Sequence, residues 1–366
     1  FNDTATTEIY TNLNTLSLHD ALPIWCIPRT SDAHPILVLG SRIHQMNVLV
    51  DVVMVLLAVL ALLGALTWFI ARSVERRIPP VGRFVDVPGV RFHVIDQGTA
   101  PAGSPPILML HGLAGQVHHF NFHLVDALAK TTRVVAIDRP GSGYSTRARD
   151  TAIRIDHQAD AVAQLLTALQ IDKALVVGHS LGGALALTLA LRHSERVAGL
   201  ALIAPLTHLL DNPPAVFRPL AVRGYLLRRL LAWTVITPSF LWRGRRVLPM
   251  VFGPESPPRG YTHKAGGLLS LRPSQFIAAT EDLEGVVASF RDISPRFAEL
   301  AQPPRPIGMI FGREDRVLDH DTHVGFLQSA LPQIRVDSVS GGHMLPVTQP
   351  ERVAQFIEDL WHASRA

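Results

Sequence analysis

The sequence predicts an α/β fold, a mostly parallel sheet with helices on both faces, and three patterns lead to it. Short continuous apolar runs alternate with helical stretches, which is typical of a parallel sheet covered on both sides. The alternation breaks at Pro205, and residues 205–295 are rich in Leu, Arg and Pro with no clear strand. An uncharged apolar run, Val52–Ala71, precedes all of this. We therefore expect one α/β domain with a helical insertion and an N-terminal transmembrane helix.

The individual elements follow from turn signals and apolar periodicity. Residues 83–96 predict a hairpin that turns at Pro88-Gly89. Helices are expected over 120–130, 156–170, 181–192 and 351–363. Further strands are expected over 106–112, 133–138, 174–180, 197–204, 305–312 and 334–343. The domain then divides into a first core part, 79–204, an inserted lid, 205–295, and a second core part, 296–366.

The apolar run Val52–Ala71 is long enough to cross about 30 Å of hydrocarbon as a helix. A buried core helix is the alternative, but such helices are rarely apolar on every face. Arg72, Arg76 and Arg77 follow the run, and no Lys or Arg lies between Met46 and its start. The positive-inside rule then predicts a bilayer anchor with the folded domain on the cytoplasmic side. The periplasmic side, and cleavage of the segment as a signal peptide, stay open.

The first 45 residues are set aside from the fold. Residues 2–24 resemble the conceptual translation of a short-read sequencing adapter, and residues 25–45 are interpreted as translated upstream sequence. Met46 is then the expected start, and 46–78 form the anchor and linker. The only cysteine, Cys26, falls in the excluded part, so the remainder has no thiol, disulfide or cysteine metal site to offer.

A serine lies where a predicted strand meets a predicted helix, in "GHSLGG" (178–183). Ser180 there could simply cap the helix. Gly178 and Gly182, however, relieve the crowding of a sharp turn that raises the hydroxyl above the sheet. The backbone N–H of Leu181 would then face a developing oxyanion at the start of the helix.

Three other loops follow predicted strands and carry useful groups. In "LHGLAG" (110–115), small residues let the backbone pass close to a substrate, so that the Leu113 N–H could donate to an oxyanion. Asp315, in "GREDRVLD" (312–319), could orient a histidine, although Glu314, Asp319 and Asp321 lie nearby. His343, in a glycine-rich loop before the last helix, has the position a general base requires.

Together with "DRPGSGYS" (138–145), these stretches resemble the α/β-hydrolase family, over nearly all of residues 83–364. The resemblance implies Ser180 as nucleophile, Asp315 as acid and His343 as base. It also implies oxyanion donors at Leu113 and Leu181, no metal and no organic cofactor. The surrounding loop residues are expected to support the site: His111, Gly112, Gly178, His179 and Gly182.

A serine at this turn, instead of an aspartate, argues against the dehalogenase and epoxide hydrolase branches of the family. Carboxylic esters are the expected substrates; thioesters, lactones, amides and carbon–carbon bonds are the alternatives. A non-catalytic membrane-tethered receptor or scaffold is the alternative from another class. The chain has a formal net charge of +4 but no motif typical of nucleic-acid binding, so a small acyl ester and the bilayer are the expected partners.

The insertion is where substrate choice is expected to lie. Around residues 225–233 several leucines alternate with arginines, which predicts an amphipathic lid helix. The simpler interpretation is that Leu226, Leu227, Leu230, Leu231 and Trp233 pack the lid onto the core, with Arg223, Arg228 and Arg229 toward solvent. The alternative is that lid and anchor together admit lipid-like acyl substrates from the membrane.

Overall fold

The computed structural model describes residues 35–149, 151, 153–209, 215–302 and 305–365. The adapter-like segment 2–24 and Cys26 lie outside these residues. The predictions made for them are therefore not addressed by the structure.

The described residues form one sheet with β2 near one edge and β9 at the other. The strands are β1 (Arg83–Val87), β2 (Val90–Gln97), β3 (Ile107–Leu110), β4 (Val134–Ile137), β5 (Thr146–Arg147), β6 (Ala174–His179), β7 (Val197–Ile203), β8 (Ile307–Gly312) and β9 (Arg335–Val339). Their order is β1-β2-β4-β3-β6-β7-β8-β9, with the short β5 beside β2.

The expected hairpin and parallel sheet are both present. β1 and β2 pair antiparallel around Pro88-Gly89, where Gly89 has a φ of +76°. β2 is also antiparallel to β4, and every pairing from β4 through β3, β6, β7 and β8 to β9 is parallel. The loops that follow β3, β6 and β8 consequently leave the same edge of the sheet, where sites assemble in this class of fold.

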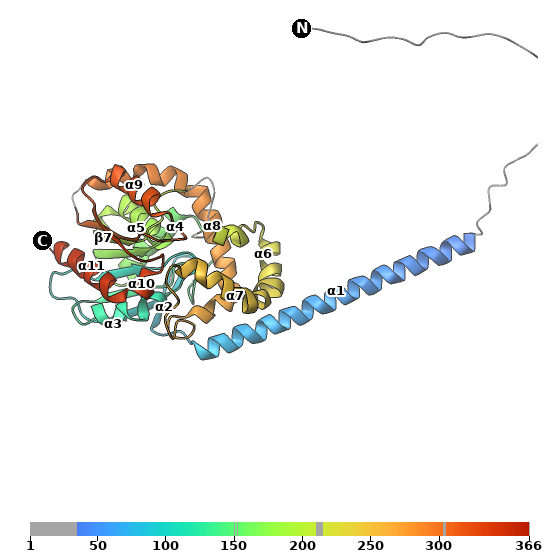
Figure 1. The fold of residues 1–366 in the computed structure, drawn as a ribbon. Coiled ribbons are helices and arrows are strands. Elements are labelled where there is room, and N and C mark those ends of the chain that lie inside the picture. The colour runs from blue at the N-terminus through green and yellow to red at the C-terminus, as the bar shows by residue number, and fades with distance from the viewer. Residues whose placement is uncertain (1–34, 150, 152, 210–214, 303–304, 366) are drawn as a thin grey trace, which may run out of the picture. The chain divides into compact units, whose positions relative to one another are not determined.

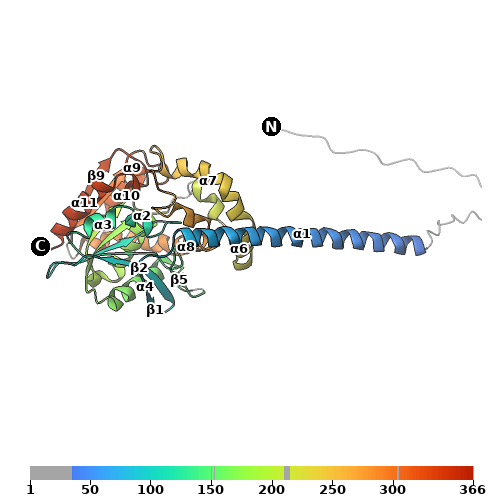
Figure 2. The ribbon, with the colours of Figure 1, turned by 90° about the horizontal axis from the view of Figure 1, so that it is seen from below.

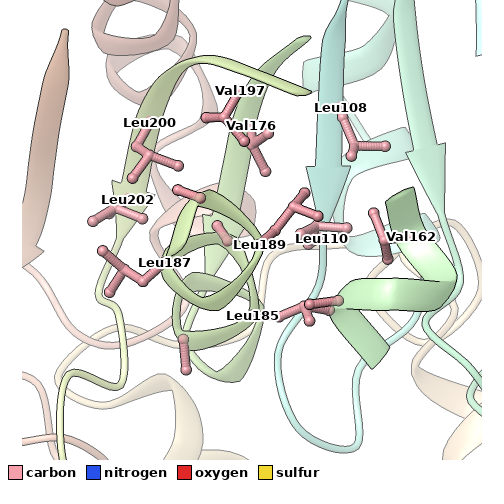
Figure 3. Close-up of a cluster of buried hydrophobic side chains, with 14 of the residues drawn as sticks. Leu108, Leu110, Val162, Val176, Leu185, Leu187, Leu189, Val197, Leu200 and Leu202 are labelled. Carbon is pink, nitrogen blue, oxygen red and sulfur yellow. The ribbon is translucent and has the colours of Figure 1, made fainter. Parts of the chain in front are cut away.

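Helices cover both faces of the sheet (Figures 1 and 2). The core helices are α2 (His118–Asn121), α3 (Leu124–Leu128), α4 (Ile155–Ala168), α5 (Leu181–Arg192), η1 (Ser194–Arg196), α9 (His320–Ala330), α10 (Leu345–Thr348) and α11 (Pro350–Ala363). α4, α5 and α9 contribute to one apolar cluster, and α2, α3, α10 and α11 to the other. Figure 3 shows the first cluster, where Leu185 and Leu189 of α5 lie among the side chains of β3, β6 and β7. The two buried faces confirm the predicted architecture.

The insertion is helical, as predicted. Between Ile203 and Ile307 the described residues contain no strand. Its elements are η2 (Ala215–Leu220), α6 (Tyr225–Leu231), the π-helical turn η3 (Ala232–Ile236), α7 (Thr237–Phe252), η4 (Gly267–Leu271), α8 (Pro273–Ile293) and η5 (Ser294–Ala301).

The packing of α6 corrects the simpler interpretation of its leucines. Leu226 is 78% exposed and Leu230 is 48% exposed, whereas Arg228 is only 5% exposed. Arg228 points inward because it forms ion pairs with two carboxylates of α8. Glu281 lies 3.4 Å and Glu284 2.5 Å from its guanidinium. Arg228 is therefore buried while Leu226, Leu227 and Leu230 face outward, whereas Arg223 and Arg229 are exposed as expected and Leu231 is half-buried.

The N-terminal helix α1 (Pro35–Arg77) is continuous and begins before Met46. Within Arg42–Arg77, an exposed window of 18 residues has a mean hydropathy of 2.9, so the segment is long and apolar enough to cross a membrane. The last turns of the helix are held by the insertion. Val74 and Ile78 form a small apolar cluster with Leu269 of η4, and Glu75 lies 3.1 Å from the Arg272 guanidinium.

Candidate active site

Ser180 occupies the sharp turn between β6 and α5. Its φ of +56° and ψ of −119° are unusual for a residue with a side chain. A Cβ added to Gly178 would lie 2.4 Å from the Gly182 carbonyl oxygen, and one added to Gly182 would lie 2.0 Å from the Leu110 oxygen. The two glycines are thus required by close backbone contacts, which is the physical reason for the Gly-x-Ser-x-Gly pattern.

The Ser180 side chain does not cap α5, so the helix-cap interpretation is wrong. Ser180 occupies the N-cap position without a capping hydrogen bond from its hydroxyl. The turn is held by the main chain instead, because the Ser180 N–H donates to Ile203 O at 3.0 Å and the Ser180 carbonyl accepts from the Leu206 N–H at 3.0 Å. The hydroxyl remains available for chemistry.

His343 and Asp315 are brought together from separate loops. His343 Nδ1 lies 2.6 Å from Asp315 Oδ2, and both side chains are almost completely buried. The other oxygen, Asp315 Oδ1, accepts hydrogen bonds from the N–H groups of Val317 and Leu318 at 2.7 and 2.9 Å. The carboxylate is therefore fixed by its own loop and presents one oxygen to the imidazole.

The three neighbouring acids have other partners. Glu314 accepts a 2.6 Å hydrogen bond from the Gly341 N–H. Asp319 caps α9 by accepting from the Thr322 N–H at 2.9 Å, and the Asp321 carboxylate is exposed and pairs with His320. Of the acids considered from the sequence, Asp315 is the one that contacts the His343 ring.

His179 connects the serine turn with the histidine loop. Its Nε2 donates to the His343 carbonyl oxygen at 3.0 Å, and the two ring centroids are 4.9 Å apart. Burial, and then the nearby His343, hold the pKa of His179 well below its ordinary value, so its ring is neutral. Within the described residues the Ser180 hydroxyl has no hydrogen bond to the His343 ring. The structure thus pairs Asp315 with His343 and places Ser180 next to His179, which contacts His343.

The two expected oxyanion donors both lie close to Ser180. Leu181 is the first residue of α5, where an N–H has no intrahelical acceptor. Leu113 follows Gly112, and a Cβ added to Gly112 would lie 2.9 Å from the Ser180 Cβ. Neither N–H donates to another residue in the described part of the chain.

Sequence reasoning missed the role of Asp138 in "DRPGSGYS". This buried carboxylate accepts from the N–H groups of Val117 and Tyr144 and contacts His93 Nδ1, so that it links its own loop with strand β2 and with the loop that follows β3. Burial alone would raise the pKa of Asp138, but these hydrogen bonds and the nearby His93 and His111 lower it. Gly143 has a φ of +55°, and an added Cβ would lie 2.1 Å from the carboxylate. The motif is therefore a structural centre beside the site.

Two further polar contacts were also missed. The Arg139 guanidinium donates to the carbonyl oxygens of His111 and Gly112 in the loop that follows β3. Glu255, from the insertion, accepts a 2.8 Å hydrogen bond from the N–H of Gly342, the residue before His343. Arg139 belonged to a quoted motif but had no assigned role, and nothing in the sequence around Glu255 signals its contact.

The described residues contain no group of three or more His, Cys, Asp or Glu side chains arranged to hold a metal ion.

Comparison with known proteins identifies the family to which the chain belongs. A family model described as "alpha/beta hydrolase fold" matches residues 105–242. The 2-hydroxy-6-oxononadienedioate/2-hydroxy-6-oxononatrienedioate hydrolase of Burkholderia vietnamiensis is 30% identical over 242 residues, which cover 63% of this chain and 77% of that protein. The chain belongs to the α/β-hydrolase family.

Other relatives share parts of the chain or only its fold. The 2-hydroxymuconate semialdehyde hydrolase of Pseudomonas sp. is 40% identical over 141 residues, 36% of this chain, and the match spans less than half, 48%, of that relative's length. A bacterial membrane phospholipase A has the same fold, with a TM-score of 0.62 and 24% identity, and the match covers 88% of this chain and 99% of that one.

Proposed function

We propose that the chain is a serine hydrolase that cleaves carboxylic esters with Ser180 as nucleophile, His343 as base and Asp315 as acid. One observation carries the proposal. The buried 2.6 Å contact between His343 and Asp315 lies on loops at the edge of the sheet from which β6 delivers Ser180 in its sharp turn. Such an arrangement activates a hydroxyl that is otherwise a poor nucleophile near neutral pH.

The proposed reaction has two halves. Ser180 Oγ attacks the ester carbonyl carbon while His343 Nε2 takes the hydroxyl proton, and the Asp315 carboxylate stabilises the resulting imidazolium. The oxyanion accepts hydrogen bonds from the N–H groups of Leu113 and Leu181. The carbon–oxygen bond to the alcohol then breaks, His343 protonates the leaving alcohol, and a water molecule activated by the same histidine hydrolyses the acyl-enzyme.

An ester panel with acyl chains from two to sixteen carbons tests this reaction. We expect the full chain, in detergent micelles, to release acid and alcohol, and Ser180→Ala to lose at least ~10³-fold in turnover with an unchanged melting temperature. Equal turnover by both proteins would refute the role of Ser180, and absence of turnover on the whole panel would refute ester hydrolysis.

We further propose that the esters are lipid-like and that the insertion contacts an anionic bilayer. The contact surface is the apolar face of α6 and η3: Tyr225, Leu226, Leu227, Leu230 and Trp233, all exposed by more than a third. Arginines accompany this apolar face, since the Arg149 and Arg229 guanidiniums lie 4.2 and 4.5 Å from the Tyr225 ring centroid. Leucine, aromatic and arginine side chains together are typical of an interfacial helix at anionic lipid.

The membrane helix supports the same partner. The insertion holds the last turns of α1 through Leu269 and Arg272, so the part of the domain with the apolar face is also the part joined to the proposed anchor. The name of the structurally similar membrane phospholipase A agrees with a lipid ester. The side of the membrane on which the domain lies stays a prediction.

Carbon–carbon hydrolysis is the second candidate, because two similar proteins are named as hydrolases of 2-hydroxymuconate semialdehyde and of 2-hydroxy-6-oxononadienedioate. The same serine, histidine and oxyanion donors would serve that reaction. Incubation with a vinylogous 1,5-diketone acid distinguishes the two, since carbon–carbon cleavage yields two products without an alcohol. Faster turnover of this compound than of every ester would replace the first candidate.

A further inference from the structure

Arg139 is the largest fully buried side chain in the described part of the protein, and its contacts converge on the oxyanion loop. Its Nε donates to the His111 carbonyl oxygen at 2.8 Å, and one terminal nitrogen donates to the Gly112 carbonyl oxygen at 3.1 Å. The other terminal nitrogen donates to Gln158 Oε1 at 3.0 Å. A planar guanidinium is suited to holding two successive carbonyls in this way.

The charge that keeps Arg139 in place comes from the insertion. Asp282 of α8 lies 2.8 Å from the Arg139 guanidinium, and both side chains are fully buried. Arg147 pairs with the other oxygen of Asp282, also at 2.8 Å. Burial alone would raise the pKa of Asp282, but the Arg139 and Arg147 guanidiniums lower it, so the carboxylate stays charged.

His111 adds a second constraint on the same loop. Its Nε2 accepts the Arg139 backbone N–H at 2.9 Å, so its Nδ1 carries the proton and donates to the Gly112 carbonyl at 2.9 Å. Burial, and then the neighbouring Arg139, lower the pKa of His111 to about 3, which keeps this tautomer neutral. With the Gly115 N–H at 3.1 Å, the Gly112 oxygen has three donors.

The orientation of the next N–H follows from the planarity of the peptide. The bond between Gly112 and Leu113 is trans, so the Leu113 N–H points opposite to the Gly112 carbonyl, away from Arg139. Gly112 itself lies against Ser180, since an added Cβ would be 2.9 Å from the serine Cβ. Reversal of this peptide would break three hydrogen bonds and leave a buried guanidinium short of an acceptor.

We propose that Arg139 is a positioning residue: pinned by Asp282 of the insertion, it holds the Gly112–Leu113 peptide with its N–H directed at the substrate oxyanion. α8 then supports the oxyanion hole through Asp282. This role rests on the proposed acyl-transfer function of Ser180.

Two arginines around one carboxylate provide a matched pair of variants. Arg139→Gln and Arg147→Gln each remove one guanidinium from Asp282, but Arg147 makes no contact with residues 111–113 in the described structure. We expect kcat/KM to fall ~100-fold in Arg139→Gln, as when one oxyanion donor is lost. Arg147→Gln should remain within about threefold of the wild type in activity while its melting temperature falls at least as much.

A pair of ketones separates positioning from general destabilisation. An alkyl trifluoromethyl ketone adds to an activated serine as a tetrahedral oxyanion, whereas the matching methyl ketone binds without that charge. In Arg139→Gln the affinity for the trifluoromethyl ketone should fall by the same factor as kcat/KM, with the methyl ketone unchanged. Arg139→Lys keeps the positive charge beside Asp282 but cannot donate to two successive carbonyl oxygens from one planar group. We therefore expect at least a ~10-fold loss of trifluoromethyl ketone affinity and of kcat/KM in this variant, even if Arg139→Gln does not fold.

The outcomes distinguish this role from the function on which it rests. The first case is a wild type that turns over esters and binds the trifluoromethyl ketone. The positioning role is then overturned if Arg139→Gln and Arg147→Gln lose activity equally. It is also overturned if Arg139→Gln leaves the ratio of the affinities for the trifluoromethyl and methyl ketones unchanged. If the wild type itself neither turns over esters nor binds that ketone, the proposed function falls and this role falls with it.

Discussion

Two helices of the insertion, α8 and α6, differ in the side chains that they bury. α8 is joined to the core by buried polar contacts: Asp282 pairs with Arg139, and Gln275 accepts from the Gly143 N–H while donating to the Gly115 carbonyl. α6 instead buries Arg228 against α8 and exposes Leu226 and Leu230. One inserted segment therefore contains a part fixed to the active-site loops and a part with an unpartnered apolar face.

This difference teaches that an insertion in the sheet need not act as one lid. Changes at the polar contacts that join α8 to the loops around Ser180, such as Asp282 with Arg139 and Gln275 with Gly115, should reduce turnover of every substrate. Changes on the apolar face of α6 and η3 should reduce only the turnover of substrate held in a bilayer. A change on the face of α6 and η3 that slows hydrolysis of soluble esters, or a change at the α8 contacts that slows only hydrolysis of substrate in a bilayer, would contradict this distinction.

The largest effect is expected at the buried acid. Asp315→Asn should lower kcat about 10⁴-fold, because the amide cannot hold the His343 tautomer or stabilise its cation. Steady-state hydrolysis of a soluble ester measures the loss. Asp319→Asn is the matched control and should change kcat by less than about threefold, since Asp319 caps α9 away from the ring. The reverse ranking would mean that Asp319 is the acid.

Stability should fall in acid because the core helices α2 and α9 carry buried neutral histidines. Burial lowers the pKa of His119 and of His323 to about 4. The unfolded chain, with a histidine pKa near 6.5, then binds more protons than the folded chain between about pH 6.5 and 4. Each histidine should reduce the free energy of unfolding by about 1.4 kcal/mol per pH unit through this window.

Urea unfolding of the full chain in micelles, from pH 7 to pH 4, measures this dependence. His323→Gln should make the slope shallower by about one proton. A free energy of unfolding that is flat or rises as the pH falls from 6.5 to 4 would contradict the buried neutral state of these rings.

The smallest effect is expected on the exposed side. Replacing Leu226 and Leu230 by serine should lower hydrolysis of phospholipid in proteoliposomes about fivefold, because less apolar area enters the interface. The ratio of this rate to that on a short soluble ester is the measurement. Val287→Ser, at a residue of α8 that is 48% exposed, is the control and should leave the ratio unchanged. An unchanged ratio of the two rates in the double variant would refute the proposed bilayer contact.

Much of the core and the site could be predicted from the sequence because local chemistry determines it. Gly178 and Gly182 are needed wherever backbone passes this close to a serine turn, and continuous apolar strands report burial on both faces. The insertion was less readable. Whether Arg228 or Leu226 faces inward depends on Glu281 and Glu284, carboxylates more than fifty residues away that no local periodicity reveals. The contact of Asp282 with Arg139 could not be predicted for the same reason, because the two residues are far apart in the sequence.

The central claim is that Ser180 is an activated nucleophile. Its most direct test is treatment of the full chain in micelles with a fluorophosphonate, followed by peptide mapping of the adduct. The account predicts a single adduct on Ser180, absent from Ser180→Ala and strongly slowed in Asp315→Asn. An adduct on another residue, or none on protein that unfolds cooperatively, would contradict it.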